Sequence, residues 1–224
     1  WILDPLCFML IYVFMFGYVF KSKQQYFAIF VFIGITLWDF FNKCLIQSVK
    51  LIKANKPIVS KVYIPKFILI LVKIGVNGFK MFISLLIIVA MLAVWRVPIT
   101  YNVIYIIPIL MTLIVLVFGF SCYLLHYGVF VEDLSNVLNI ALRFLFYLTG
   151  IFWNIMDRLP APYNSYIGRC NPIAFLLTSA RDCVIYGSTP HRKLLLLWFV
   201  IGLIISALGV RKIYKNENSY VKVI

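Results

Sequence analysis

Long hydrophobic runs alternate with short polar stretches along the whole of this 224-residue chain. A helix needs about 20 apolar residues to cross a hydrocarbon layer about 30 Å thick. The pattern therefore predicts an all-α integral membrane protein that forms a single transmembrane domain over residues 1–224. We expect six transmembrane helices, at residues 1–20, 26–45, 67–95, 103–125, 138–153 and 194–210.

The stretch between the second and third expected spans, residues 46–66, is the longest polar interruption in the first half of the chain and is called the elbow here. From residue 43 to residue 66 the chain carries six lysines and no acidic residue. Lysine and arginine concentrate in cytosolic loops of membrane proteins. The elbow and the basic C-terminal tail therefore predict that both chain ends lie in the cytosol.

A second polar stretch, residues 154–193, separates the fifth and sixth expected spans and is called the hairpin here. Asn171 is a plausible N-cap, Pro172 stands at the first helical position, and Gly187 is a plausible stop signal. The sequence between them is too polar for a lipid-facing span and too apolar for an open loop. We expect a re-entrant or interfacial helix on the external side.

Composition narrows the class of protein. Hydrophobic residues make up 64% of the chain and charged residues 12%, whereas soluble domains are about half apolar and a quarter charged. The net charge of +14 lies in clusters between apolar runs without a nucleic-acid-binding motif, which favours basic loops beside anionic lipid. The five cysteines form no C-x-x-C, and we expect no metal site. Cys170 and Cys183 either pair or pack as small residues.

Lys66, Lys73 and Lys80 are spaced seven apart and fall near one helix face. The uncharged stretch after Lys80 is too short to span alone, so Lys80 is expected at membrane depth, about 8 Å inside the boundary. Two interpretations stay open. The lysines extend to the interface as anchors, or they form a positive stripe along the path of an anionic substrate.

Motifs that would supply energy or catalysis do not occur in the sequence. It contains no G-x-x-x-x-G-K-[ST] loop, no G-x-S-x-G and no H-E-x-x-H. Only Asp39 among the acidic residues stands near a span interior, so the buried carboxylates typical of ion-coupled carriers are not evident. A transport protein of this composition is expected to receive its energy from another subunit.

Three stretches together resemble one family. Residues 1–16 begin WILDPL and continue with aromatic residues, residues 38–65 contain WDFF and KVYIP, and residues 148–190 contain TGIFW, LPAPY and Asn171-Pro172. In this order and spacing they are similar to the membrane subunit of type-2 ABC transporters that export polysaccharides such as O-antigen or teichoic acid. Where the family tends to show an Arg-Asp pair after the fourth span, this chain has Glu132-Asp133.

The resemblance implies a homodimer of this chain in the bacterial cytoplasmic membrane, with a separate ATP-binding subunit below each copy. ATP and Mg²⁺ would bind to that subunit, with no cofactor and no catalytic residue in this chain. The substrate would be a lipid-linked glycan. The elbow then becomes a candidate coupling helix in which Leu51 and Ile52 enter a groove of the ATPase, and the alternative is a topological anchor. The candidate coupling residues are Ser48, Lys50, Leu51, Ile52, Lys53, Asn55 and Lys56.

A glycan crossing the membrane needs a polar or aromatic path, because its hydroxyl groups would otherwise lose their hydrogen bonds. The candidate path residues are Tyr12, Phe16, Trp38, Phe41, Lys73, Lys80, Tyr147 and Trp153. For the aromatic residues the alternative is an interfacial belt or lipid-facing bulk. The hairpin is the candidate external gate, and its proposed residues are Pro160, Pro162, Asn171, Pro172, Arg181 and Gly187.

Two other functions stay open at this point. One is an ABC exporter of a drug or small lipid, and the other is a membrane-embedded glycosyltransferase or acyltransferase. The transferase would need a catalytic acid or histidine at an interface, for which His126, His191 and Asp157 are the available residues.

Overall fold

The computed structural model describes residues 26–59, 61, 64–98, 100–153, 168–217, 219 and 220, together with the single positions 7, 10, 11 and 14. Within these ranges the chain is helical and contains no strand, as the sequence predicts. The helices are α2 (Phe27–Val49), α3 (Leu51–Ala54), α4 (Lys56–Val59), α5 (Lys66–Val94), η2 (Tyr101–Tyr105), α6 (Ile106–Phe130), α7 (Leu134–Leu148), α10 (Pro172–Val184) and α11 (Arg192–Lys215).

Among the described residues, four helical segments are long and apolar enough to cross a membrane: α2, α5, the η2–α6 segment and α11. They occupy four of the six expected spans. The expected first span lies almost wholly outside the described residues. The expected fifth span corresponds to α7, a helix of 15 residues that begins and ends earlier than the sequence indicates and is shorter than a full crossing needs.

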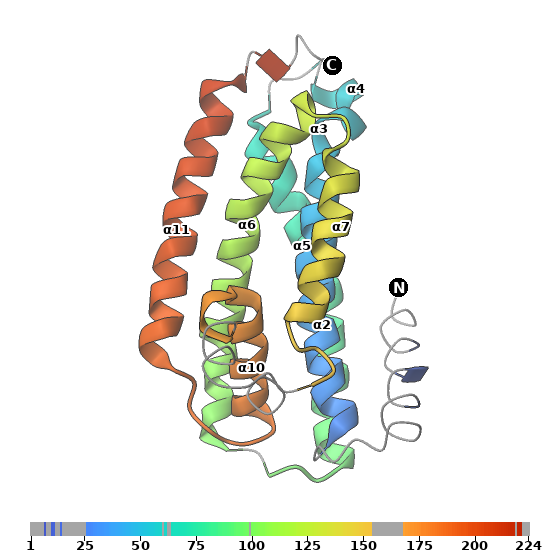
Figure 1. The fold of residues 1–224 in the computed structure, drawn as a ribbon, viewed down its shortest axis with the longest axis vertical. Helices are drawn as coiled ribbons and strands as arrows, with labels where there is room; N and C mark the ends of the chain where they lie inside the picture. Colours follow the sequence, from blue (N-terminus) through green and yellow to red (C-terminus); the bar gives the residue numbers. More distant parts are fainter. Residues whose placement is uncertain are drawn as a thin grey trace.

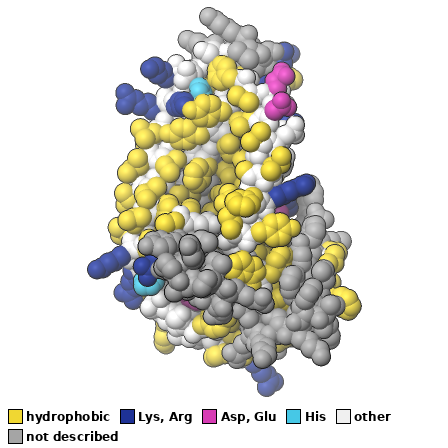
Figure 2. Space-filling model, viewed as in Figure 1, with side chains coloured by type: hydrophobic (Ala, Val, Ile, Leu, Met, Phe, Trp, Pro, Cys, Tyr) yellow, Lys and Arg dark blue, Asp and Glu magenta, His cyan; other side chains and the backbone are white. Residues whose placement is uncertain are grey.

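The long helices lie side by side, with the short elements at their two ends (Figure 1). Helices α3 and α4, the start of α7 and the end of α11 share one end, called the elbow end here. η2 and α10 lie toward the opposite end, called the hairpin end, where α10 packs on both α2 and α6. Figure 2 shows that hydrophobic side chains cover the middle of the visible face and that most Lys and Arg side chains lie toward its ends. This distribution is that of a membrane-embedded bundle.

Small residues hold α6 and α11 in close contact. The Ser206 hydroxyl of α11 donates a 3.0 Å hydrogen bond to the carbonyl of Val115 in α6. A Cβ added to Gly209 would lie 2.7 Å from the Cβ of Cys122, and one added to Gly202 would lie 3.1 Å from a Val115 methyl. The prediction that Gly202 and Ser206 allow close helix contact is confirmed, because backbones approach closely only where side chains are small.

We expect Gly209→Ala to lower the stability of the bundle. The added methyl group would force α6 and α11 apart, and such overpacking costs about 1–3 kcal/mol. Gly75→Ala in α5 is the matched control, because a Cβ there meets nothing within 4 Å. Thermal unfolding in detergent, followed by tryptophan fluorescence, measures both variants. Equal unfolding midpoints for the two variants would contradict the close α6–α11 contact.

Candidate functional site

The elbow folds into the short helices α3 and α4, and its apolar residues divide between two environments. Leu51 and Ile52 are only 2% and 1% exposed, because α3 packs on α5 and α6. The expectation that these two side chains enter a groove of another subunit is therefore wrong, since they belong to the core of this chain. Ile58 of α4 is instead 49% exposed.

The outward face of the elbow, called the elbow surface here, is basic with an apolar centre. Asn55 joins α3 to α4, and its side-chain amide donates a 2.8 Å hydrogen bond to the Leu51 carbonyl. Ser48 is buried and donates to the Cys44 carbonyl, so it faces inward. The elbow surface consists of the exposed residues Lys50, Lys53, Ala54, Lys56, Pro57 and Ile58.

A buried ion pair ties the C-terminal tail to the end of the elbow. Lys66, the first residue of α5, is 3% exposed, and its ammonium lies 3.2 Å from the carboxylate of Glu217. The ring of Phe67 packs against Tyr214 of α11, with ring centroids 5.8 Å apart. Lys66 therefore does not share a substrate-facing stripe with Lys73 and Lys80, because its charge is directed into the protein.

Tyr220 extends this contact between the tail and the bundle. Its side chain is fully buried, and its hydroxyl lies 2.8 Å from Nδ1 of His126 in α6. Burial, together with the charge of Glu217, raises the pKa of the Tyr220 phenol, so the hydroxyl stays protonated. His126, near the end of α6, is thus a buried residue that holds the tail.

We expect Lys66→Met to lower the free energy of unfolding by about 3 kcal/mol, because it leaves the Glu217 carboxylate buried without its cation. The double variant Lys66→Met/Glu217→Leu should recover most of that loss, since an apolar pair can replace a buried ion pair. Lys61→Met, at an exposed elbow position, is the control. Chemical unfolding in detergent micelles measures the series. A double variant as unstable as the single one would argue against a direct pair.

At the hairpin end, α10 begins where the sequence indicates. The Asn171 side-chain oxygen accepts hydrogen bonds from the backbone N–H groups of Ile173 and Ala174, at 3.1 and 3.3 Å, and Pro172 is the first helical residue. Gly187 has a φ of 63°, which explains a glycine at the stop. Its carbonyl accepts a hydrogen bond from the Asn102 side chain, which ties the hairpin to the start of the η2–α6 segment.

Arg181 of α10 connects three segments. It is 3% exposed, and its guanidinium donates to the carbonyls of Phe30 (3.1 Å), Gly150 (2.9 Å) and Ile151 (2.7 Å). The guanidinium carbon also lies 3.6 Å from the centroid of the Phe30 ring. Gly34 of α2 leaves the space that the guanidinium fills. Arg181 thus supplies donors to the backbone after α7 and fixes α10 against α2.

We expect Arg181→Lys to destabilise the protein by about 2–4 kcal/mol, because an ammonium cannot reproduce the planar fork and leaves buried carbonyls unpaired. Arg192→Lys is the matched control. Arg192 is the first residue of α11, and its guanidinium carbon lies 5.1 Å from the ring centroid of Tyr105 in η2. Thermal unfolding of both variants tests the difference, and a similar midpoint for the two would contradict the bridging role.

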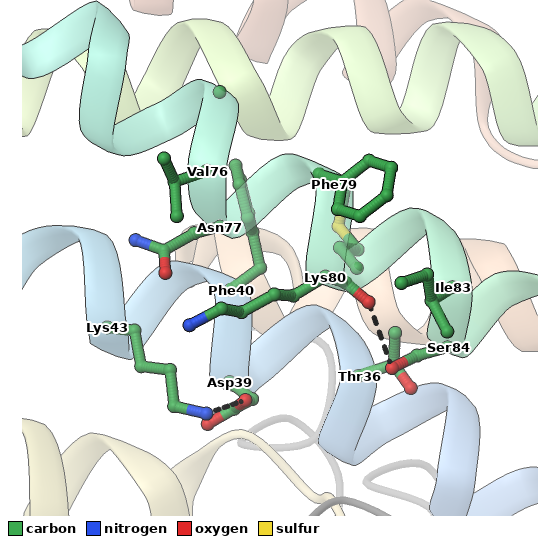
Figure 3. A pocket seen from close by; sticks show the side chains of 12 residues that line it. Thr36, Asp39, Phe40, Lys43, Val76, Asn77, Phe79, Lys80, Ile83 and Ser84 are labelled. Carbon is green, nitrogen blue, oxygen red and sulfur yellow. Dashed lines mark hydrogen bonds and ion pairs between the residues drawn. The ribbon is translucent and has the colours of Figure 1, made fainter. Parts of the chain in front are cut away.

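Lys80 lines a groove between α2 and α5 that has a volume of about 740 Å³ (Figure 3). It stands midway along α5. The Asp39 carboxylate and the Lys43 ammonium, one helical turn apart on α2, form a 2.6 Å ion pair in the same groove. Lys73 does not line it. The groove residues are Thr36, Asp39, Phe40, Lys43, Gly75, Val76, Asn77, Phe79, Lys80, Met81, Ile83 and Ser84.

The aromatic path candidates lie in different environments. Trp38 and Phe41 are buried, and the Trp38 ring packs on Phe41 and on Phe146 of α7 at centroid distances of 5.6 and 5.5 Å. Both rings therefore belong to the core of one copy. Tyr147 is 69% exposed on α7, and Trp153 is partly buried. The candidates Tyr12, Phe16, Pro160 and Pro162 lie outside the described residues.

Sequence reasoning missed the contacts that join distant segments. No local spacing pattern in the sequence indicates the pairs Lys66–Glu217 and His126–Tyr220. The Asp39–Lys43 pair does have a signal, namely opposite charges four residues apart on a helix. Cys170 and Cys183 are both free cysteines, the first exposed and the second buried, so they do not form a disulfide here.

The fold and these sites define a multi-pass helical membrane protein with a basic, tail-bound end. No protein-family model matches the chain. It is 24% identical over 222 residues to the O-antigen export system permease protein RfbA of Klebsiella pneumoniae, an alignment that covers 99% of this chain and 85% of that protein. Another RfbA from Klebsiella pneumoniae is 24% identical over 224 residues, covering 100% and 85%.

These two relatives confirm the resemblance to the permease subunits of polysaccharide-exporting ABC transporters that the sequence motifs indicated. Because the similarity extends over the whole chain, it includes both the elbow and the hairpin. It favours the export interpretation over a membrane-embedded transferase, since both relatives are named as permeases.

Proposed function

We propose that this chain is the permease subunit of an ATP-driven ABC exporter that moves a lipid-linked polysaccharide across the bacterial cytoplasmic membrane. The observation that carries the proposal is the similarity of almost all of this chain to two O-antigen export permeases. The bundle of membrane-crossing helices agrees with a transport role. ATP and Mg²⁺ bind to a separate subunit, because the sequence has no nucleotide-binding loop of its own.

The ATPase docks on the elbow surface. Ile58 is an exposed apolar residue in a basic surround that includes Lys53 and Lys56. This combination suits a groove with an apolar floor and acidic rims. The buried Leu51 and Ile52 fix the same elbow to α5 and α6, so a displacement of the elbow moves the spans.

The elbow end faces the cytosol in this proposal. The elbow and the C-terminal end of α11 lie at the same end of the bundle, and both are basic (Figure 1). The tail contacts at Lys66 and His126 join the elbow end of α5 and α6 to α11. A displacement of the elbow is therefore transmitted to α11 as well as to α5 and α6.

Two copies of the chain form the exporter, and the glycan passes between them. The exposed Tyr147 on α7 supports an aromatic wall for this path, because aromatic faces stack on sugar rings. The hairpin acts as the external gate. Arg181 and the Asn102–Gly187 hydrogen bond support that role, because they attach α10 to α2 and to the η2–α6 segment.

We expect Ile58→Asp to reduce co-purification of the chain with the ATP-binding subunit of its export system by at least about tenfold, because a charge then replaces the apolar centre of the elbow surface. Lys53→Glu should weaken the association in a salt-dependent way. Affinity purification of the tagged permease from membranes measures both effects.

Lys193→Glu, at an exposed position on the hairpin end, is the matched control and should leave the association unchanged. Thermal unfolding establishes that Ile58→Asp still folds. If a folded Ile58→Asp variant retains the ATPase as the unaltered chain does, docking on the elbow surface is ruled out.

A further inference from the structure

Exposed basic side chains gather around the start of α11, at the hairpin end. Arg192 and Lys193 are the first two residues of this helix, and both are exposed. Arg169 is exposed as well, and its carbonyl accepts a 3.3 Å hydrogen bond from the indole N–H of Trp198, in the second turn of α11. In Figure 2, Lys and Arg side chains gather beside a histidine toward this end of the visible face. The residues Arg169, Arg192 and Lys193 are called the basic cluster here.

Acidic side chains do not balance the basic cluster within the described part of the chain. Neither Arg192 nor Lys193 forms an ion pair with another described residue. The carboxylate of Asp182 in α10 interacts with Arg181 and with His191, the residue before α11. One carboxylate shared in this way leaves the surface with an excess of positive charge, which attracts an anion.

The fold itself does not explain these charges. Cations in the first turn lower the stability of a helix, because the helix dipole is positive at its N-terminus. The positive-inside pattern places Lys and Arg at one end of a membrane protein, and the elbow end already carries them. A negatively charged ligand therefore accounts for a basic cluster at the opposite end.

The surroundings of the basic cluster identify the ligand as a lipid. The guanidinium carbon of Arg192 lies 5.1 Å from the ring centroid of Tyr105, which holds the cation where η2 meets α11. Tyr and Trp rings are typical of the membrane interface. Exposed apolar side chains follow Lys193 at helical spacing along one side of α11, and this α11 face consists of Leu197, Val200 and Ile204. A ligand with phosphate at the cluster therefore continues as hydrocarbon along the α11 face.

We propose that the basic cluster and the α11 face bind an anionic phospholipid of the leaflet at the hairpin end. Arg192 and Lys193 contact the lipid phosphate, and Arg169 adds to the positive field around it. An acyl chain lies along the α11 face. The ring of Tyr105 is a positioning group that acts through Arg192. The inference goes beyond the proposed export function, because it requires only that the bundle lies in a bilayer.

The test places the full-length chain in phosphatidylcholine nanodiscs with a small fraction of a photoreactive lipid. The probes are phosphatidylglycerol and phosphatidylcholine that carry the same diazirine-labelled acyl chain, and mass spectrometry locates the crosslinked peptides. At residues 192–204 the yield should be at least about tenfold higher with phosphatidylglycerol, since each exposed cation contributes to binding of the anionic lipid. The exposed side of α5 at residues 82–89 is the internal reference and should give equal yields.

Equal yields from the two probes at residues 192–204 would overturn the proposal and identify an ordinary lipid contact. Glycerol phosphate, added in solution, presents the same phosphate without acyl chains and should leave the phosphatidylglycerol yield unchanged. If it suppresses crosslinking at residues 192–204, the lipid assignment is overturned in favour of a site for free phosphate.

Charge variants at the two ends of α11 locate the headgroup. Arg192→Gln/Lys193→Gln should lower the phosphatidylglycerol yield at residues 192–204 about tenfold or more. Both residues are exposed, so the thermal midpoint should not fall. Arg211→Gln/Lys215→Gln is the matched control, because it removes two exposed cations from the other end of the same helix. Equal losses in the two double variants would overturn the assignment to the basic cluster.

Tyr105→Leu tests the positioning role of the ring. It should lower the phosphatidylglycerol yield about threefold, because the stacked guanidinium loses its support. In the Arg192→Gln background the same substitution should cause no further loss, since the group that the ring positions is then absent. A loss of equal size in both backgrounds would contradict action through Arg192.

Discussion

The guanidinium of Arg181 resolves the main physical problem of this fold. Inside a membrane protein, irregular backbone is tolerated only where its polar groups find partners within the protein. The chain leaves regular helix after α7, and the carbonyls of Gly150 and Ile151 turn inward there. Arg181 supplies donors to both and to Phe30 of α2. This side chain therefore helps to fix the position of the hairpin helix, and with it the proposed gate, together with the Asn102–Gly187 hydrogen bond.

Ionic contacts at the elbow end and in the groove have different consequences. Lys66 and Glu217 are buried together, so that pair serves to hold the tail against the bundle. The Asp39–Lys43 pair is instead partly exposed in the groove between α2 and α5. Breaking an enclosed pair leaves a buried charge without its partner, whereas a partly exposed pair is solvated and contributes little to stability. The Lys66–Glu217 pair therefore contributes to the arrangement of the segments more than the Asp39–Lys43 pair does.

The elbow combines a rigid inner side with an accessible outer side. Leu51 and Ile52 fill the core between α5 and α6, and Ile58 lies on the surface among lysines. The same short segment can thus receive a partner and remain fixed to the spans. The tail contacts at Lys66 and His126 extend that connection to α11. Force applied at the elbow surface is distributed over several long helices.

Features that depend on neighbouring residues could be predicted from the sequence alone. The helical class follows from the length of the apolar runs, and the start of α10 follows from Asn171 and Pro172. The turn after α10 contains the expected Gly187. The close packing of α11 on α6 at Gly202 and Ser206 could also be predicted, because small residues at that spacing favour close helix contact. Each of these signals arises within one turn or one helix.

Only the tertiary structure decided which way the side chains of the elbow face and which distant groups meet. Leu51 and Ile58 are both apolar residues in a basic segment, and their local sequence does not distinguish core from surface. The partners of Lys66, His126 and Arg181 come from other segments of the chain, 30 or more residues away in the case of Arg181. The reason is physical: burial and long-range pairing are properties of how helices pack, and local composition determines the helices but not their contacts.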